Sequence, residues 1–336
     1  MGDAGFCRHH TIDLFPHETE YHHWCFEWPQ LHDIISKEAG LLLFLTRKID
    51  LVSLARSALC QGILVAVAFS LLVLGCDAAR AQGKLDGRYT ASLAGVTIGK
   101  GAWVIDIADD QYTAAASGMT IGLLRVFASG EGSGASRGYI INGNLIPSSY
   151  AASITADKKT EELRIVISAG TVKDYSVDPP TPPHPDRVPL AEAHRHGVTD
   201  PMSAALMRVS GTGDVVSPEA CARTLPIFDG RLRYDLKLAF KRIEIVKAEK
   251  GYEGPVAVCA VYFTPLAGYI PDRPAIKYLV AQRDMEVWLA PLAGTRIVVP
   301  FRMVIPTPLG TGILEATQFV SLPQPPRPTP TSAKLQ

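Results

Sequence analysis

The sequence lacks an excess of charge of either sign. Its 336 residues include 33 Lys and Arg and 33 Asp and Glu, so the formal net charge is zero. Nucleic-acid-binding proteins usually carry a clustered basic excess, so we expect no nucleic-acid partner. Hydrophobic residues make up 47% and charged residues 20%, as in globular proteins. The length allows one large domain or two modest ones.

Motifs that carry chemistry are also scarce. His194, His196, Asp200 and Ser203 include the residue types of a nucleophilic triad, but we expect no nucleophile elbow around Ser203 or any other serine. Asp200 followed by Pro201 is typical of a helix start. The glycine-rich residues 130–134 lack the Gly-Lys-Ser/Thr of a phosphate loop, and we interpret them as a flexible hairpin loop. We therefore expect no enzyme, no catalytic residue and no cofactor.

A long uncharged stretch is the most informative feature. Residues 57–76 carry no charge, Arg47, Lys48 and Arg56 precede them, and Ala79-Arg80-Ala81 follows. This order predicts a helical signal peptide over residues 47–81, cleaved between Ala81 and Gln82, and hence a periplasmic protein. Two alternatives stay open: an uncleaved N-terminal membrane anchor, and a lipoprotein lipidated at Cys76 within a lipobox-like Val-Leu-Gly-Cys.

Residues 1–46 precede this signal, and we interpret them as a non-native extension from an upstream start codon. Six of the nine histidines lie within the first 32 residues. The cluster resembles a metal site by residue type, but its spacing does not follow a zinc pattern. We therefore expect no metal. The cluster comprises Cys7, His9, His10, His17, His22, His23 and Cys25.

Cysteine is rare in the remainder of the chain. Beyond residue 81 only Cys221 and Cys259 are present. Two cysteines in an oxidising compartment predict one disulfide. The alternative is a pair of separate buried thiols.

From residue 82 to 322 the sequence is typical of a β-rich exported domain. Short segments of β-branched and aromatic residues alternate with turn signals, and residues 232–245 follow a period-two pattern over most of their length. We predict a mainly antiparallel, curved open sheet or incomplete barrel with one or two short helices. A helix is expected over residues 201–209, a strand over 275–282, an extended proline-rich connection at 178–185, and a disordered tail at 323–336.

Several segments together resemble an uncharacterised family of exported proteobacterial proteins, known only as a domain of unknown function. The resemblance covers about residues 85–321 and implies export and a β-rich domain similar to the open curved sheets of envelope lipoprotein carriers. It brings no assigned activity. The matching pieces are Tyr89, Gly95, Gly99, residues 192–204, 221–231 and 234–236, Cys259, Tyr262, Gly268, Tyr269, and residues 287–289, 300–302 and 309–310.

The expected function is that of a periplasmic, non-enzymatic binding or carrier protein for a hydrophobic or envelope-derived molecule, such as a lipid. Tyr262, Tyr269, Trp288 and Phe301 are candidates for lining an apolar cavity, although sheet cores use such residues routinely. The pair Asp229 and Arg231 fits a ligand contact, and a plain Asp-Gly turn explains it equally. The alternative function is a structural or assembly factor of the envelope that contacts other envelope proteins.

Overall fold

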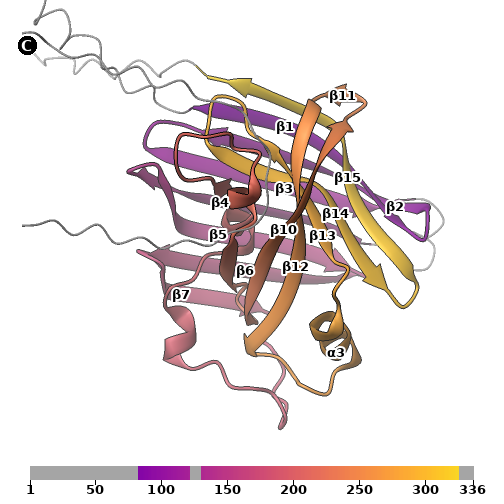
Figure 1. Ribbon diagram of the computed structural model, residues 1–336. Helices are drawn as coiled ribbons and strands as arrows, with labels where there is room; N and C mark the ends of the chain where they lie inside the picture. The colour runs from indigo at the N-terminus through magenta and orange to yellow at the C-terminus, as the bar shows by residue number, and fades with distance from the viewer. Residues whose placement is uncertain (1–81, 122–129, 325–336) are drawn as a thin grey trace, which may run out of the picture. The chain divides into compact units, whose positions relative to one another are not determined.

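The computed structural model describes residues 82–121 and 130–324 (Figure 1). The predicted extension, the signal peptide up to Ala81, Cys76 and the N-terminal Cys/His cluster lie outside the described residues. The same holds for the predicted tail beyond Gln324. Within the described part no helix has the length and apolar character needed to cross a membrane.

The described chain folds into one large antiparallel sheet. Its strand order is β7-β6-β5-β4-β3-β2-β1-β15-β14-β13-β12-β10-β9, with β11 beside β15 and β8 beside β14. The first seven strands form a meander, and every residue of β1 pairs with β15. The strands are β1 Gly83–Leu93, β2 Val96–Ile107, β3 Gln111–Thr120, β4 Gly130–Ile141, β5 Asn144–Ala156, β6 Lys159–Ser168, β7 Thr171–Asp178, β8 Met207–Arg208, β9 Arg223–Phe228, β10 Arg233–Lys247, β11 Lys250–Gly251, β12 Glu253–Ala267, β13 Glu286–Pro291, β14 Ile297–Thr307 and β15 Gly310–Pro323.

The sheet curves so that its two halves face each other. Figure 1 shows β10, β12 and β13 crossing steeply in front of the meander. The main core lies between the two halves, because Leu85 and Ile105 from the meander cluster with Phe301 and Phe319 from β14 and β15. This confirms the predicted curved, open antiparallel sheet.

The segment between His196 and Thr199 bridges the two sheet edges, β7 and β9. His196 pairs with Thr171 of β7, and Thr199 pairs with Ile227 of β9. Val198 between them is buried against residues of both edges, including Phe228. The gap between the edges is thus covered by a few residues of extended chain, which leaves neither edge fully exposed.

The helices differ from two of the predictions. Helix α2 spans only Pro201–Ala204, because Met207 and Arg208 leave the helical path to pair with β14. The segment predicted as a strand at 275–282 is instead helix α3, Pro274–Ala281. Pro274 occupies its first turn, and Ile276, Leu279 and Val280 follow the helical spacing of three and four residues. Two single-turn 3-10 helices, η2 Glu192–Arg195 and η3 Pro218–Ala220, complete the described helices.

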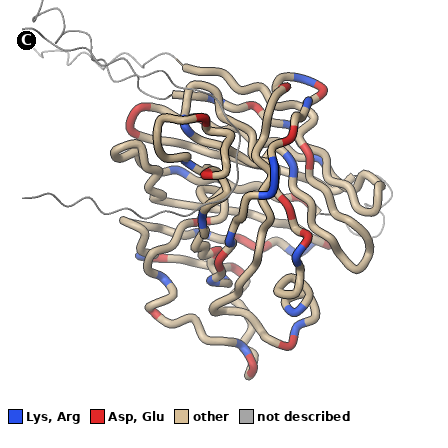
Figure 2. The backbone as a smooth tube through the Cα atoms, viewed as in Figure 1, with Lys and Arg blue, Asp and Glu red and all other residues tan. Residues whose placement is uncertain are grey.

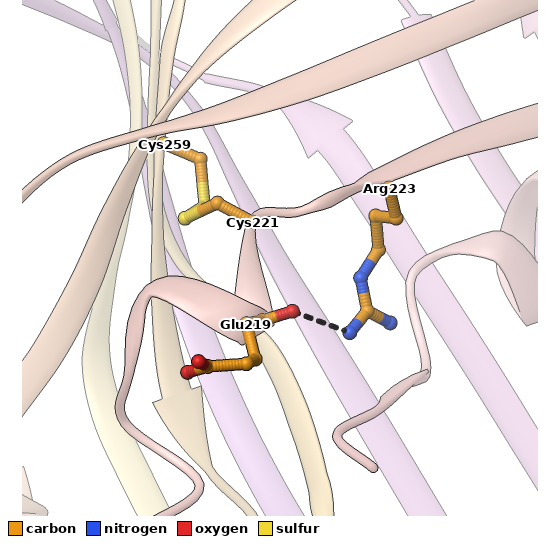
Figure 3. The surroundings of a disulfide bond; sticks show 4 residues. All are labelled: Glu219, Cys221, Arg223 and Cys259. Carbon is orange, nitrogen blue, oxygen red and sulfur yellow. Dashed lines mark hydrogen bonds between the residues drawn. A yellow bond between two sulfur atoms is a disulfide. The ribbon is translucent and has the colours of Figure 1, made fainter. Parts of the chain in front are cut away.

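The predicted disulfide between Cys221 and Cys259 is present. Cys221 follows η3 and Cys259 lies in β12, with 5.5 Å between their Cα atoms (Figure 3). Both residues are fully buried in a second core cluster. The guanidinium of Arg223 donates to the Glu219 carbonyl at 3.2 Å and holds the short loop beside the bond. The disulfide therefore fastens the irregular segment after β8 to strand β12, the third strand from the β9 edge of the sheet.

Candidate functional site: an apolar cavity beneath a row of glycines

A row of glycines crosses the inner face of the meander. The register places Gly101 of β2 opposite Gly118 of β3, and Gly118 opposite Gly132 of β4. Tyr89 of β1 and Ile154 of β5 stand at the two ends of the row. Inward positions of a sheet normally carry the large side chains that fill the core. Here three neighbouring strands present no side chain.

This row corrects one prediction from the sequence. Residues 130–134 were expected to form a flexible loop, but they open strand β4. The reason is alternation, since Gly130, Gly132 and Gly134 face inward while Glu131 and Ser133 face solvent. With glycine at every second position, this part of β4 still pairs with β3 and β5, and its inner face carries no side chains.

Backbone geometry requires only part of the row to be glycine. A Cβ atom at Gly101 would lie 2.9 Å from the Ser117 carbonyl oxygen, which is too close. At Gly118 and Gly132 the nearest atoms would be 3.5 Å away, an ordinary contact. Glycine inside a strand costs about 0.5–1 kcal/mol relative to alanine. Two of the three glycines thus lower stability without a backbone reason, and their effect is to keep space open.

The space left by the row is an apolar cavity of about 550 Å³. Strands β14 and β15 supply Pro300, Met303 and Leu314, and Ala205 follows helix α2. Ile154 is 55% exposed and marks a side on which the cavity opens. Volumes of this size and apolar lining are typical of small-molecule sites. Further lining residues are Tyr89, Ala91, Ile98, Trp103, Ala116, Met119 and Ala156.

In contrast, the other end of the same inner face is filled. In the next row, at the border of the cavity, Trp103 stands opposite Ala116. Beyond it, Leu85, Ile105 and Ile165 are almost fully buried. The inner face of the meander therefore grades from large side chains at one end to glycine at the other. The cavity is an ordered part of the sheet design and not a gap between domains.

A buried polar cluster holds α2 above the meander. Asp200 Oδ1 accepts hydrogen bonds from the amides of Met202 and Ser203, at 3.0 and 2.9 Å, and so caps the helix. Its Oδ2 accepts from Ser136 Oγ of β4 at 3.1 Å. Ser203 Oγ lies 2.7 Å from both Ser136 Oγ and Tyr112 Oη. Burial raises the pKa of Asp200, against the lowering effect of these hydrogen bonds.

This cluster explains the residues that suggested a hydrolase. The Ser203 hydroxyl bonds to the hydroxyls of Tyr112 and Ser136 and not to an imidazole. The two histidines form hydrogen bonds elsewhere. His194 Nδ1 accepts from the Ala191 amide at 3.0 Å, and His196 contacts Thr171 Oγ1 at 3.3 Å. The four candidates therefore do not assemble as a triad.

Ser136 was overlooked in the sequence, although Gly134-Ala-Ser-Arg-Gly138 matches the nucleophile-elbow spelling G-x-S-x-G. An elbow requires a sharp turn between a strand and a helix that exposes the serine. Ser136 instead lies in the middle of β4 and is 3% exposed. Its glycine neighbours have a packing role, because a Cβ at Gly138 would lie 2.6 Å from the ring of Tyr112.

The four aromatics expected to line a cavity lie elsewhere. Trp288 and Phe301 are packed in the main core, and Trp288 Nε1 donates to Glu244 at 2.7 Å. Tyr262 and Tyr269 are partly buried in and beyond β12. None of the four lines the cavity under the glycine row. The aromatic residues that do line it are Tyr89, whose hydroxyl donates to the Pro300 carbonyl at 2.8 Å, and Trp103.

Asp229 and Arg231 serve the turn between β9 and β10. Asp229 Oδ1 accepts from the amides of Arg231 and Leu232 at 2.9 and 2.6 Å. The Arg231 guanidinium pairs with Glu161 at 3.1 Å and donates to Thr181 at 2.8 Å. Both side chains are therefore satisfied within the fold. In the described residues no group of three or more His, Cys, Asp or Glu side chains is arranged to hold a metal ion.

Comparison with known proteins identifies the family. The model of the family described as "Protein of unknown function (DUF3108)" matches residues 88–317. The chain belongs to this family. The match runs from β1 to β15 and contains every glycine of the row, so the cavity lies inside the DUF3108 domain. The recognised resemblance to an uncharacterised family is thereby confirmed.

Comparisons with curated proteins and with solved structures are less informative. No curated protein matches the chain. A crystal structure titled as a beta-barrel-like protein of domain of unknown function DUF1849, from Brucella abortus, is similar with a TM-score of 0.40 and 9% sequence identity. The similarity covers 72% of this chain and 99% of the Brucella chain.

Proposed function

We propose that this DUF3108 protein is a non-enzymatic binding or carrier protein for an apolar molecule of the cell envelope, held in the cavity beneath the glycine row. The observation that carries the proposal is the hollow itself, because Gly118 and Gly132 leave space that larger residues would fill without backbone conflict. A lipid acyl chain or another small apolar compound is the class of ligand that fits such a lining.

The chemistry of the lining supports this class. Ile98, Met303 and Leu314 offer aliphatic or thioether surface, and Ala91, Ala116 and Ala156 add small apolar side chains to the lining. Each methylene group that leaves water contributes about 0.8 kcal/mol to binding. Affinity would therefore grow with the length of the buried chain, and selectivity would come from shape more than from hydrogen bonds.

A periplasmic location belongs to the same proposal. The uncharged stretch 57–76, with its preceding positive charges, is a typical export signal. The disulfide between Cys221 and Cys259 fits an oxidising compartment. Intact-mass spectrometry of the protein recovered from the periplasm tests the location, and we expect the mass of a mature chain that begins at Gln82, as glutamine or as its cyclised pyroglutamate form.

Filling the hollow tests the binding proposal. The double variant Gly118→Leu with Gly132→Leu places two side chains in the cavity from neighbouring strands. A dansyl-labelled fatty acid reports binding through enhanced, blue-shifted fluorescence. Excluding even two methylene groups of the probe costs about 1.6 kcal/mol, so we expect the affinity to fall at least about tenfold.

The matched control uses the next residue on each strand. The side chains of Ser117 and Ser133 point to the outer face of the sheet, so Ser117→Leu with Ser133→Leu adds the same side-chain volume on the face opposite to the glycine row's inner side. We expect this control to bind the probe like the unsubstituted protein. If the unsubstituted protein gives no saturable signal, or if filled and control proteins bind equally, the cavity is not a binding site. The assembly-factor alternative then gains weight.

A further inference from the structure

Two hairpins end side by side at the cavity end of the sheet. They are the turns at residues 94–96, between β1 and β2, and at residues 308–310, between β14 and β15; we call them the hairpin tips. The Ala94 amide donates to the Thr311 carbonyl at 3.0 Å and ties the tips together. Leu309 is 77% exposed and Val96 is 60% exposed. Each tip thus presents an aliphatic side chain to solvent.

The hairpin tips lie in stretches without charge. Residues 89–99 and 303–314 contain no Asp, Glu, Lys or Arg. Figure 2 shows the ends of these hairpins, at the right, without blue or red. Protruding apolar side chains in an uncharged surround are typical of a surface that contacts an apolar environment.

The backbone of the β14–β15 tip suits an apolar environment. The Leu309 amide donates to Thr307 Oγ1 at 3.2 Å, and the same hydroxyl donates to the Gly310 carbonyl at 2.6 Å. Pro306 and Pro308 have no amide hydrogen. Lipid offers no hydrogen bonds, so a segment that enters it must satisfy its own polar groups. A protein partner would impose no such demand.

The hairpin tips also lead directly to the cavity. Ile98 follows one tip by two residues, Leu314 follows the other by four, and both line the cavity. We propose that the hairpin tips insert into the surface of a lipid bilayer and hold the open side of the cavity against it. This inference rests on the proposed function for its purpose, since an apolar ligand would then pass between membrane and cavity without crossing water.

Charges near the tips are mixed. Lys100 of β2 and Glu131 of β4 face outward on either side of β3, and Asp157, Lys158 and Lys159 lie at or next to the β5–β6 turn at the same end of the sheet. Because both signs are present, attraction to anionic lipid is weak. The docking we propose is therefore driven by apolar insertion and should persist at high salt.

Tryptophan at a tip would report insertion directly. Leu309→Trp is mixed with vesicles of phosphatidylethanolamine and phosphatidylglycerol, and its emission is taken as a difference from the unsubstituted protein. We expect a blue shift, and quenching when the lipids carry brominated acyl chains, in low and high salt alike. Ile245 is 72% exposed on β10 in charged surroundings, so Ile245→Trp is the control and should show neither effect.

Vesicle flotation gives a second measurement. Leu309→Glu with Val96→Glu should lower the bound fraction by about tenfold or more, because a carboxylate resists transfer into lipid, whereas Ile245→Glu should not. An unshifted Leu309→Trp spectrum, equal flotation of the tip and control variants, or binding abolished by salt would overturn the inference. Vesicle binding needs no ligand and probe uptake needs no vesicle. If the unsubstituted protein takes up the probe normally but does not bind vesicles, this inference is rejected and the proposed function still stands.

Discussion

Removing the disulfide should destabilise the domain by a calculable amount. Cys221 and Cys259 are 38 residues apart in sequence. Closing a loop of that length removes about 13 cal/mol/K of entropy from the unfolded chain, which corresponds to about 4 kcal/mol at room temperature. For a domain of this size we expect Cys221→Ala with Cys259→Ala to lower the melting temperature by about 8–16 °C. Urea unfolding followed by circular dichroism measures the free energy directly.

Two further measurements test the disulfide prediction. The unsubstituted protein, unfolded and then refolded with a reductant, should have the stability of the double alanine variant. Mass spectrometry of unreduced tryptic peptides should recover the Cys221 peptide linked to the Cys259 peptide. A double variant within about 1 kcal/mol of the oxidised protein would refute the loop-entropy reasoning, and two unlinked peptides would refute the pairing.

Two smaller predictions concern Asp200 and Gly230. Burial raises the folded-state pKa of Asp200, so the stability that its protonated carboxyl contributes is present below the ordinary pKa of about 4 and is lost as the pH rises through the raised value. Asn retains the capping ability but does not titrate, so Asp200→Asn should gain stability relative to the unsubstituted protein between about pH 3 and about pH 7. Urea titrations at both pH values measure this difference in unfolding free energy, and a difference that stays constant would contradict the assignment. Gly230 has a φ of +89°, and a Cβ there would lie 2.1 Å from Leu163 Cδ1, so Gly230→Ala should cost at least about 1–2 kcal/mol in urea unfolding. Gly213→Ala, where a Cβ meets nothing within 4 Å, should stay within about 0.5 kcal/mol; equal losses at the two glycines would contradict the role of the turn conformation.

Much of the fold could be predicted because period-two alternation is a local signal. In β10 the residues alternate between apolar and polar over most of the strand, and the prediction of 232–245 recovered it almost entirely. The Asp229-Gly230 turn was equally accessible, since a turn with a positive φ favours glycine. Errors arose where tertiary pairing overrode local preference. Pro201 and Asp200 do start a helix, but pairing with β14 ends it after one turn.

The cavity was harder to predict than the sheet. The prediction of cavity-lining residues chose large aromatics such as Trp288 and Phe301. Such residues are typical of positions where side chains fill a core. A cavity is defined by side chains that are absent, and glycine usually signals a turn. The available signal was the spacing, because Gly130, Gly132 and Gly134 alternate with Glu131 and Ser133 as one face of a strand does. Reading that spacing as period two would have assigned β4 from the sequence alone.

What the sequence could not supply was the alignment of glycines from different strands. Gly101, Gly118 and Gly132 are separated by 17 and 14 residues, and only the register of two antiparallel pairings, β2 with β3 and β3 with β4, brings them into one row. A shift of a single residue in any pairing would turn a glycine outward and bring an outward residue such as Lys100 or Glu131 to the inner face. The cost of burying a charge in an apolar cavity is large. The charged neighbours of the glycines thus help to fix the register that creates the hollow.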